Sequence, residues 1–355
     1  MTVKGKRKRE YGIDLLRIVS MFMVVVLHVL LQGGVLANAK MMSSQYLAAW
    51  FLEMTCFCAV NVFAMISGYV GLKSKCRLGR LFSLWLQVVF YTVLFTIICA
   101  LTVPDLLEPG IWMKMWFPIT SGVYWYITAY AGIYMFTPLM NAAVEHTPRK
   151  QLELSLLASF VLLCILPVFV QSNAYALNAG YTMVWIGIMY LAGAYLKKYN
   201  VPAVLTKSKA ALVFLASTLL SFGGRLLMVS FLPALAAKPD FIAPFASYLS
   251  PLMVINAAAL VCFFAHVKCR FKPVRMMVTL LAPAALGVYI IHLYPVIWDH
   301  VISNMAIGLA SAAPVGLVFG VLGYALGIYA LCSALEVLRL RLFKMVQQTM
   351  HKGRS

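Results

Sequence analysis

The sequence predicts an all-α fold, a polytopic transmembrane helical bundle of about ten spans with both termini in the cytoplasm. Three observations support this. The chain has 355 residues, of which 63% are hydrophobic and only 11% charged, a composition outside the range of soluble domains. Its apolar runs approach the roughly 20 residues that cross a bilayer as a helix. Its Lys and Arg residues gather in alternate loops. Strand-like alternation is absent, so an outer-membrane barrel is not expected.

Ten apolar runs are separated by short polar loops. The expected spans lie near residues 11–32, 46–72, 79–102, 122–143, 152–171, 181–197, 210–231, 245–267, 276–298 and 313–338. The first run is too long for the apolar region of a signal peptide and lacks a small-residue cleavage site, so we expect it to be retained. We expect a basic cytoplasmic arm (1–10), one membrane domain (11–338) and a basic cytoplasmic tail (339–355). The tail either lies on the membrane surface or joins a further cytoplasmic domain.

The net charge of +19 is explained by topology. Of the 29 Lys and Arg residues, 24 fall in segments on the side of the N-terminus. Only Lys40, Lys114 and Lys238 fall in the opposite loops. This distribution follows the positive-inside rule and indicates contact with anionic lipids; nucleic acid is not an expected partner. We place the chain in a bacterial cytoplasmic (inner) membrane as a multi-pass protein.

The cysteines and the loops limit where chemistry can occur. All eight cysteines fall within spans or on the cytoplasmic side, so an extracellular disulfide is not expected. Cys56 and Cys58 lie on different faces of a helix and lack nearby ligands, so no metal is expected there. The outer loops are short, which leaves no separate extracytoplasmic catalytic domain. Any reaction must therefore occur within the bundle.

Ionisable residues inside spans are the main functional candidates. A charged side chain at mid-membrane costs about 2.5–3.5 kcal/mol on insertion scales, so such residues usually serve a function. We select six residues within the expected spans as candidates: Asp14, Arg17, His28, Glu53, Arg225 and His292.

Arg17 and His28 are expected to lie on one face of the first helix. They are eleven residues apart, which is three turns plus about 20°, and about 16 Å along the axis. The helix then presents a cation near the inner side and an imidazole near the outer side. Asp14 lies one turn before Arg17, so a structural ion pair between Asp14 and Arg17 is the alternative interpretation.

Four ionisable residues on separate spans are expected at a similar height in the outer half. These are His28, Glu53, Arg225 and His292, with Tyr289 one turn before His292. A set of unrelated polar residues, each satisfied within the core, is the alternative. Trp125 belongs to a group of aromatic residues near the outer boundary, which either form an interfacial belt or stack on a sugar ring.

Arg77 and Arg80 lie at the cytoplasmic mouth of the third span. Their spacing of three places both guanidinium groups on one helix face near its N-terminus, where the helix dipole also favours an anion. Arginine binds phosphate in a planar, bidentate way. A positive-inside anchor explains the pair equally well.

In these residues the sequence resembles the acyltransferase-3 family of integral-membrane acyltransferases, of the glycan O-acetyltransferase type. The most specific element is Arg-x10-His in the first helix, Arg17 to His28. Further matches are N-V-F-A-M-I-S-G-Y at 61–69, Arg77-x-x-Arg80, V-Y-W-Y-I-T-A-Y-A-G-I-Y-M-F-T-P-L-M-N at 123–141 and G-V-Y-I-I-H-L-Y-P at 287–295. The resemblance covers nearly the whole chain.

The resemblance implies an O-acyltransferase. A cytoplasmic acyl-CoA, usually acetyl-CoA, would thread into the bundle and supply an acyl group to a hydroxyl of an extracytoplasmic cell-surface glycan, without a metal. His28 would be the catalytic base or transient acyl carrier, and Arg17 would support the donor. Arg77 and Arg80 would hold the CoA phosphates. One branch of the family carries an acidic residue where Thr128 and Ala129 stand here, so Glu53 becomes the candidate carboxylate.

Acyl transfer to a hydroxyl needs a base and positive charge around the oxyanion. The imidazole of His28 suits the first task, because the ordinary pKa of histidine is about 6.5. Arg225 or His292 could supply the positive charge around the oxyanion. Both, together with Tyr289 and Trp125, could also contact the acceptor. Glu53 could orient His28 or bind sugar hydroxyls. Direct transfer and a covalent acyl-His28 intermediate both fit.

A transport protein is the alternative function. Several helices with buried His, Glu and Arg residues also suit a permease or flippase. They equally suit the serine-supplying membrane domain of a racemase-type glycopeptide-resistance protein, which would connect the chain to cell-wall chemistry and antibiotic resistance. Gly223 and Gly224 beside Arg225 fit a broken helix of this kind. Neither paired broken helices nor an inverted repeat is evident in the sequence.

Overall fold

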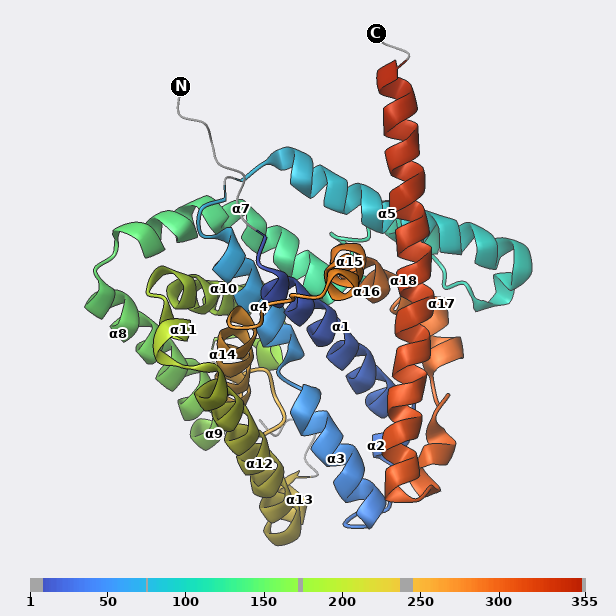
Figure 1. Cartoon of the computed structure of the whole chain (residues 1–355). Helices are drawn as coiled ribbons and strands as arrows, with labels where there is room; N and C mark the ends of the chain where they lie inside the picture. Colours follow the sequence, from blue (N-terminus) through green and yellow to red (C-terminus); the bar gives the residue numbers. More distant parts are fainter. Residues whose placement is uncertain (1–8, 75, 172–174, 237–244, 353–355) are drawn as a thin grey trace.

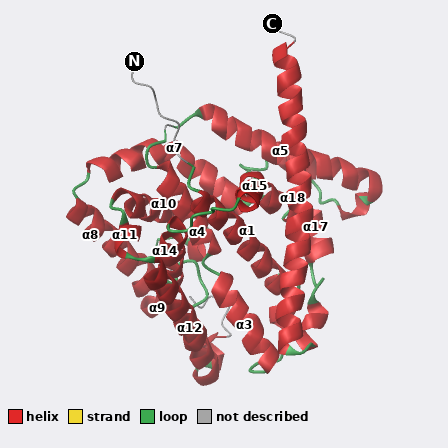
Figure 2. Cartoon of the chain, in the orientation of Figure 1, coloured by secondary structure: helices red, strands yellow, loops and turns green. Residues whose placement is uncertain are grey.

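The computed structural model describes residues 9–352 except 75, 172–174 and 237–244. It is helical, and no strand occurs in these residues (Figure 2). Most of the expected basic arm, together with Lys75, Lys238 and Arg354, lies outside the described residues.

The longer helices follow the expected spans. The α-helices are α1 (Tyr11–Leu31), α2 (Val35–Asn38), α3 (Ser44–Cys56), α4 (Ala59–Gly71), α5 (Leu78–Thr102), α6 (Ile111–Trp116), α7 (Trp125–His146), α8 (Arg149–Phe160), α9 (Leu166–Val170), α10 (Met183–Lys198), α11 (Val201–Val204), α12 (Lys207–Phe231), α13 (Pro233–Ala236), α14 (Pro251–Ala265), α15 (Lys272–Leu281), α16 (Ala285–His292), α17 (Pro295–Ile297) and α18 (Pro314–Lys352). Short 3₁₀ segments lie at Pro104–Leu106, Asn178–Gly180 and Ile307–Ser311, and π-helical turns at Val161–Ile165 and Trp298–Ile302.

Six helical segments among the described residues are long and apolar enough to cross a membrane. They are Tyr11–Asn38, Ser44–Gly71, Leu78–Thr102, Arg149–Val170, Lys207–Phe231 and Pro314–Thr349, and counting the bent pair α15 and α16 as one span gives seven. Helices α7, α10 and α14 occupy the remaining expected positions but do not meet this criterion, α10 and α14 being only 16 and 15 residues long. The expected count of ten spans is therefore not confirmed.

The expected ninth span is broken. Helices α15 and α16 meet at a 45° bend across the break 282–284, where Pro283 cannot donate the backbone hydrogen bond that a continuous helix requires. Expected span three also departs from a simple parallel bundle, because α5 runs across the long α18 in Figure 1. The tail expected from residue 339 continues the last span without a break, as the end of α18.

Helix α1 lies in the core, packed against α4, α14, α16 and α18. Its Leu16, Val25 and Leu30 are completely buried. Gly12 allows close contact with α14, since a Cβ at this position would stand 2.1 Å from the Phe264 carbonyl oxygen. The start of α1 and the end of α18 point to the same side of the molecule (Figure 1).

Helices α4 and α10 cross in close contact. A Cβ on Gly68 would stand 1.8 Å from the Tyr190 carbonyl oxygen, and one on Gly193 would stand 1.9 Å from that of Met65. Both positions therefore require glycine, because the two backbones are in direct contact.

Candidate active site

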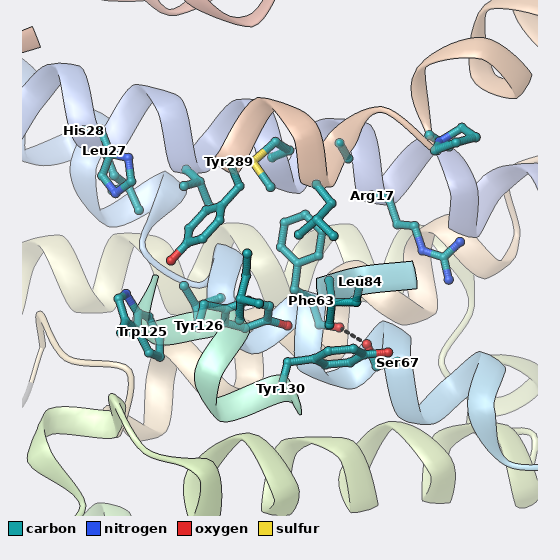
Figure 3. Close-up of a pocket in the computed structure, with 18 of the residues that line it drawn as sticks. Arg17, Leu27, His28, Phe63, Ser67, Leu84, Trp125, Tyr126, Tyr130 and Tyr289 are labelled. Atoms are coloured by element: carbon teal, nitrogen blue, oxygen red, sulfur yellow. Dashed lines mark hydrogen bonds between the residues drawn. The ribbon is translucent and has the colours of Figure 1, made fainter. Parts of the chain in front are cut away.

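A cavity of about 290 Å³ runs along α1 between Arg17 and His28. The two residues lie at opposite ends of it in Figure 3. Met21 and Val24 line it between them, as expected from residues three and four apart on one helix face. Eleven residues of helix separate the two polar ends by about 16 Å. The other walls come from α4, α5, α7 and α16, together with Tyr248 and the break at 282–283.

At one end of the cavity, Arg17 shares a carboxylate with a second arginine. Arg17 Nη1 lies 2.9 Å from Asp14 Oδ1, and Arg9 Nε lies 2.5 Å from Asp14 Oδ2. The Asp14–Arg17 ion pair left open by the sequence is thus formed. One carboxylate faces two guanidinium groups, so this end keeps a net positive charge. The Arg17 side chain is still 33% exposed and lines the cavity, which leaves it able to bind an anion.

At the other end, His28 is hydrogen-bonded to His292. Nδ1 of His28 lies 2.8 Å from Nε2 of His292, and Nδ1 of His292 lies 2.5 Å from the Val288 carbonyl oxygen. His292 is buried, with 1% exposure, while His28 is partly exposed and lines the cavity. The Trp298 ring meets the His28 ring edge to face at 4.8 Å between centroids. His28 is therefore held by contacts on the side away from the cavity.

Between the two ends the cavity has an aromatic wall. Trp125 and Tyr126 of α7 and Tyr289 of α16 contribute to it (Figure 3). Tyr248 also lines the cavity. The Trp125 and Tyr248 rings stack at 6.1 Å. Ser67 of α4 supplies a hydroxyl, which donates to the Phe63 carbonyl oxygen at 3.0 Å. Such a passage suits a slender, mainly apolar group carrying few polar atoms.

A row of tyrosines leads from the cavity toward the arginine pair. Tyr126, Tyr130 and Tyr134 are four residues apart on α7, and their neighbouring rings are 6.5 and 6.1 Å apart. Arg77 precedes α5 and donates its backbone N–H to the Tyr134 hydroxyl at 3.2 Å. Arg80 and Arg17 both lie within electrostatic range of Tyr130.

The structure thus links Arg77 and Arg80 to the Arg17 end of the cavity. Both arginines are exposed, and neither lines the cavity itself. Neither makes an ion pair among the described residues, so both guanidinium groups are accessible to an anion.

Glu53 and Arg225 form a second polar set. Glu53 is 5% exposed, its Oε2 has no hydrogen-bond partner, and Arg225 lies within electrostatic range of it. The Arg225 guanidinium stacks over Trp50, 3.2 Å from the ring centroid. Neither ionisable residue lines the cavity, and no hydrogen bond joins Glu53 to His28 among the described residues. The four residues expected at one polar level therefore form two pairs. Tyr248 lies between them, close to Glu53 and on the cavity wall.

Sequence reasoning missed a fully buried carboxylate, Glu336 of α18. It accepts hydrogen bonds from Tyr91 Oη at 2.6 Å and Gln87 Nε2 at 3.1 Å, both on α5. Arg339 binds it through two nitrogens, at 2.6 and 2.8 Å. Glu336 lies near the inner end of its expected span and is not among the six candidates selected from the sequence. The i, i+3 spacing of Glu336 and Arg339 was the available sequence signal, because it places the two side chains on one helix face where they can form an ion pair.

The tyrosine row was also missed, although the four-residue spacing of Tyr126, Tyr130 and Tyr134 is visible in the sequence. It was interpreted only as part of a longer aromatic motif.

A family model described as an acyltransferase domain, that of acyltransferase-3, matches residues 10–335. This match covers nearly the whole chain. No curated protein and no solved structure matches the sequence.

Proposed function

The chain belongs to the acyltransferase-3 family, and from this premise we propose that it is a membrane O-acyltransferase that moves an acetyl group from cytoplasmic acetyl-CoA to a hydroxyl of an extracytoplasmic cell-surface glycan. The observation that carries the proposal is the single cavity that Arg17 and His28 both line. Its length of about 16 Å along α1 suits a donor held at one end and reacting at the other.

The donor side is assigned to three arginines. Arg77 and Arg80 bind the phosphates of CoA at the start of α5, where charge and the helix dipole both favour an anion. Arg17 supports the polar part of the donor that enters the cavity. The aromatic wall and Ser67 guide the remaining arm toward His28.

His28 performs the chemistry in this proposal. Its imidazole removes the proton of the acceptor hydroxyl while the hydroxyl oxygen attacks the thioester carbonyl carbon. The carbon–sulfur bond then breaks, and the imidazolium returns the proton to the departing thiolate. In the covalent variant, an imidazole nitrogen attacks the thioester carbonyl carbon and the carbon–sulfur bond breaks. The acceptor hydroxyl then attacks the acyl-imidazole, its proton passes to the thiolate, and the carbon–nitrogen bond breaks.

The acceptor side is assigned to the outer polar and aromatic residues. Trp125 and Tyr289 line the cavity beside His28 and present ring faces and a hydroxyl to a sugar. Glu53 and Arg225 lie beyond Tyr248, where a carboxylate oxygen without a partner suits a ligand hydroxyl. We assign the protein to the bacterial cytoplasmic membrane, with the basic segments facing inward.

The decisive experiment uses the purified chain in lipid nanodiscs with radiolabelled acetyl-CoA and a cell-wall glycan acceptor. The wild-type protein should transfer label, and His28→Ala should abolish transfer while the protein stays folded, as judged by a cooperative thermal unfolding transition. His146→Ala, an exposed histidine at the end of α7, is the matched control and should retain activity. Wild-type serine uptake in liposomes without turnover of acetyl-CoA would overturn the proposal in favour of transport.

A further inference from the structure

We infer that His292 is a positioning residue that holds His28 in the tautomer with hydrogen on Nδ1, so that Nε2 is the reacting nitrogen. The inference rests on the proposed function for its catalytic meaning. It differs from the expectation that His292 contacts the acceptor or the oxyanion.

The backbone carbonyl of Val288 fixes the tautomer of His292. A carbonyl oxygen can only accept, so the 2.5 Å contact requires hydrogen on Nδ1 of His292. A neutral imidazole carries one hydrogen, and Nε2 of His292 must then be an acceptor. Nδ1 of His28, 2.8 Å away, therefore donates to it.

His292 is neutral because nothing nearby balances a charge. It is 1% exposed, and its hydrogen bonds go to Val288 and His28. None of the ion pairs among the described residues includes it. A buried charge without a partner is strongly unfavourable, so the doubly protonated ring is excluded. Only a doubly protonated His292 would carry hydrogen on Nε2 and donate it to Nδ1 of His28. Excluding that form therefore also excludes the opposite tautomer of His28.

The ring of His28 is fixed in direction as well as in tautomer. His292 lies in the last turn of α16, and Val288 lies one turn earlier in the same helix, so the acceptor is built into a rigid element. Trp298 also packs against the His28 ring, edge to face. Nδ1 of His28 is occupied by His292, and Nε2 has no hydrogen-bond partner among the described residues. Because His28 lines the cavity, Nε2 is the nitrogen free to react there.

The arrangement has a chemical consequence at the moment of proton transfer. When Nε2 takes the hydroxyl proton, His28 becomes an imidazolium, and its Nδ1–H···Nε2 bond to His292 becomes charge-assisted and stronger. The proton then leaves from Nε2 to the thiolate, which restores both neutral rings. His292 thus occupies the place of the carboxylate in a Ser-His-Asp triad, without burying a permanent charge.

The tautomer can be measured without any activity. The full chain is labelled with ¹⁵N-histidine in nanodiscs, and the His28 signals are identified by comparison with His28→Ala. We expect a protonated Nδ1 and an unprotonated Nε2 in the wild type. The reverse pattern would overturn the inference even if acyl transfer is observed. The expected pattern together with no acyl transfer would overturn the proposed function and leave the positioning role intact.

Activity provides the second measurement. His292→Leu removes the acceptor, and kcat should fall about 10–100-fold, since a hydrogen bond to a charged group contributes about 1.5–3 kcal/mol. KM for acetyl-CoA should change less than about threefold, since the donor is bound at the other end. His292→Gln retains an amide acceptor and should recover most of the lost kcat, while His300→Leu, at an exposed position, should match the wild type. Unchanged kcat in His292→Leu, or no recovery in a folded His292→Gln, would overturn the role.

Discussion

Gly287 of α16 lies directly against Glu336 of α18. A Cβ at position 287 would stand 2.5–2.7 Å from three carbons of the Glu336 side chain. The carboxylate cannot move aside easily, because Tyr91, Gln87 and Arg339 all bind it. This contact joins the helix that carries His292 to the longest helix of the bundle.

Gly287→Ala should therefore destabilise the protein. Overpacking a filled site costs about 1–3 kcal/mol, and the melting temperature in detergent should fall accordingly. Gly327→Ala on α18 is the matched control, since a Cβ there meets open space. Helix propensity should make that control neutral or up to about 1 kcal/mol more stable. Equal melting temperatures for the two variants would contradict the packing described here.

Removing the Glu336 charge should be costly because it leaves Arg339 buried without compensation. Glu336→Gln should lower the free energy of unfolding by about 3–5 kcal/mol, the usual effect of breaking a buried ion pair. Glu336→Gln/Arg339→Met should recover part of this loss. Arg149 and Glu153 form an exposed i, i+4 pair, and Glu153→Gln should cost much less. Thermal unfolding of these three variants and the wild type checks the order, and a loss in Glu336→Gln no larger than that in Glu153→Gln would contradict the prediction.

Arg17→Gln should weaken donor binding more than it slows the chemical step. A charge-assisted hydrogen bond contributes about 1.5–3 kcal/mol, so KM for acetyl-CoA should rise about 10–100-fold. Arg17→Lys keeps the charge but loses the planar fork, and an intermediate KM is expected. Steady-state kinetics at saturating acceptor measure this. A fall in kcat with an unchanged KM would assign Arg17 to the reaction itself.

Ser67→Leu should block the passage. Ser67 lines the cavity from α4, and the larger side chain fills space between Arg17 and His28. We expect kcat/KM for acetyl-CoA to fall at least about tenfold, or about 1.4 kcal/mol in transition-state stabilisation. Ser83→Leu, on the exposed side of α5, is the control and should keep wild-type kinetics. Full activity of Ser67→Leu would mean that the donor takes another route.

Charge removal at Arg77 and Arg80 should reduce the affinity for CoA. Arg77→Gln/Arg80→Gln should need at least about tenfold more CoA in a thermal-shift titration, because both proposed phosphate contacts would be lost. Lys150→Gln/Lys209→Gln removes the same charge from exposed positions elsewhere and should bind like the wild type. Equal affinity in all three proteins would return Arg77 and Arg80 to a role as membrane anchors.

The sequence predicted what depends on local periodicity. The shared face of Arg17 and His28 follows from a spacing of eleven residues along one helix, and both line one cavity. The helical class follows from apolar run length. Membrane height alone, however, did not determine which outer residues pair. His292 joins His28 and Arg225 joins Glu53 because of helix rotation and tilt, which depend on packing between distant segments.

Two further features required tertiary information. The bend at 282–284 coincides with Pro283, yet prolines also occur in helices that stay continuous, as Pro138 does in α7. The burial of Glu336 depends on α5 crossing α18, and no spacing within α18 could predict that crossing.

The glycine crossing of α4 and α10 also bears on how the bundle can open. Two backbones in direct contact at Gly68 and Gly193 cannot slide or separate without losing this close packing. Ser67 belongs to α4, so we expect the α4 wall of the cavity to stay in place. If the cavity widens to admit the proposed donor, we expect the movement on the wall formed by α16 and the break at 282–284, which separates α16 from α15.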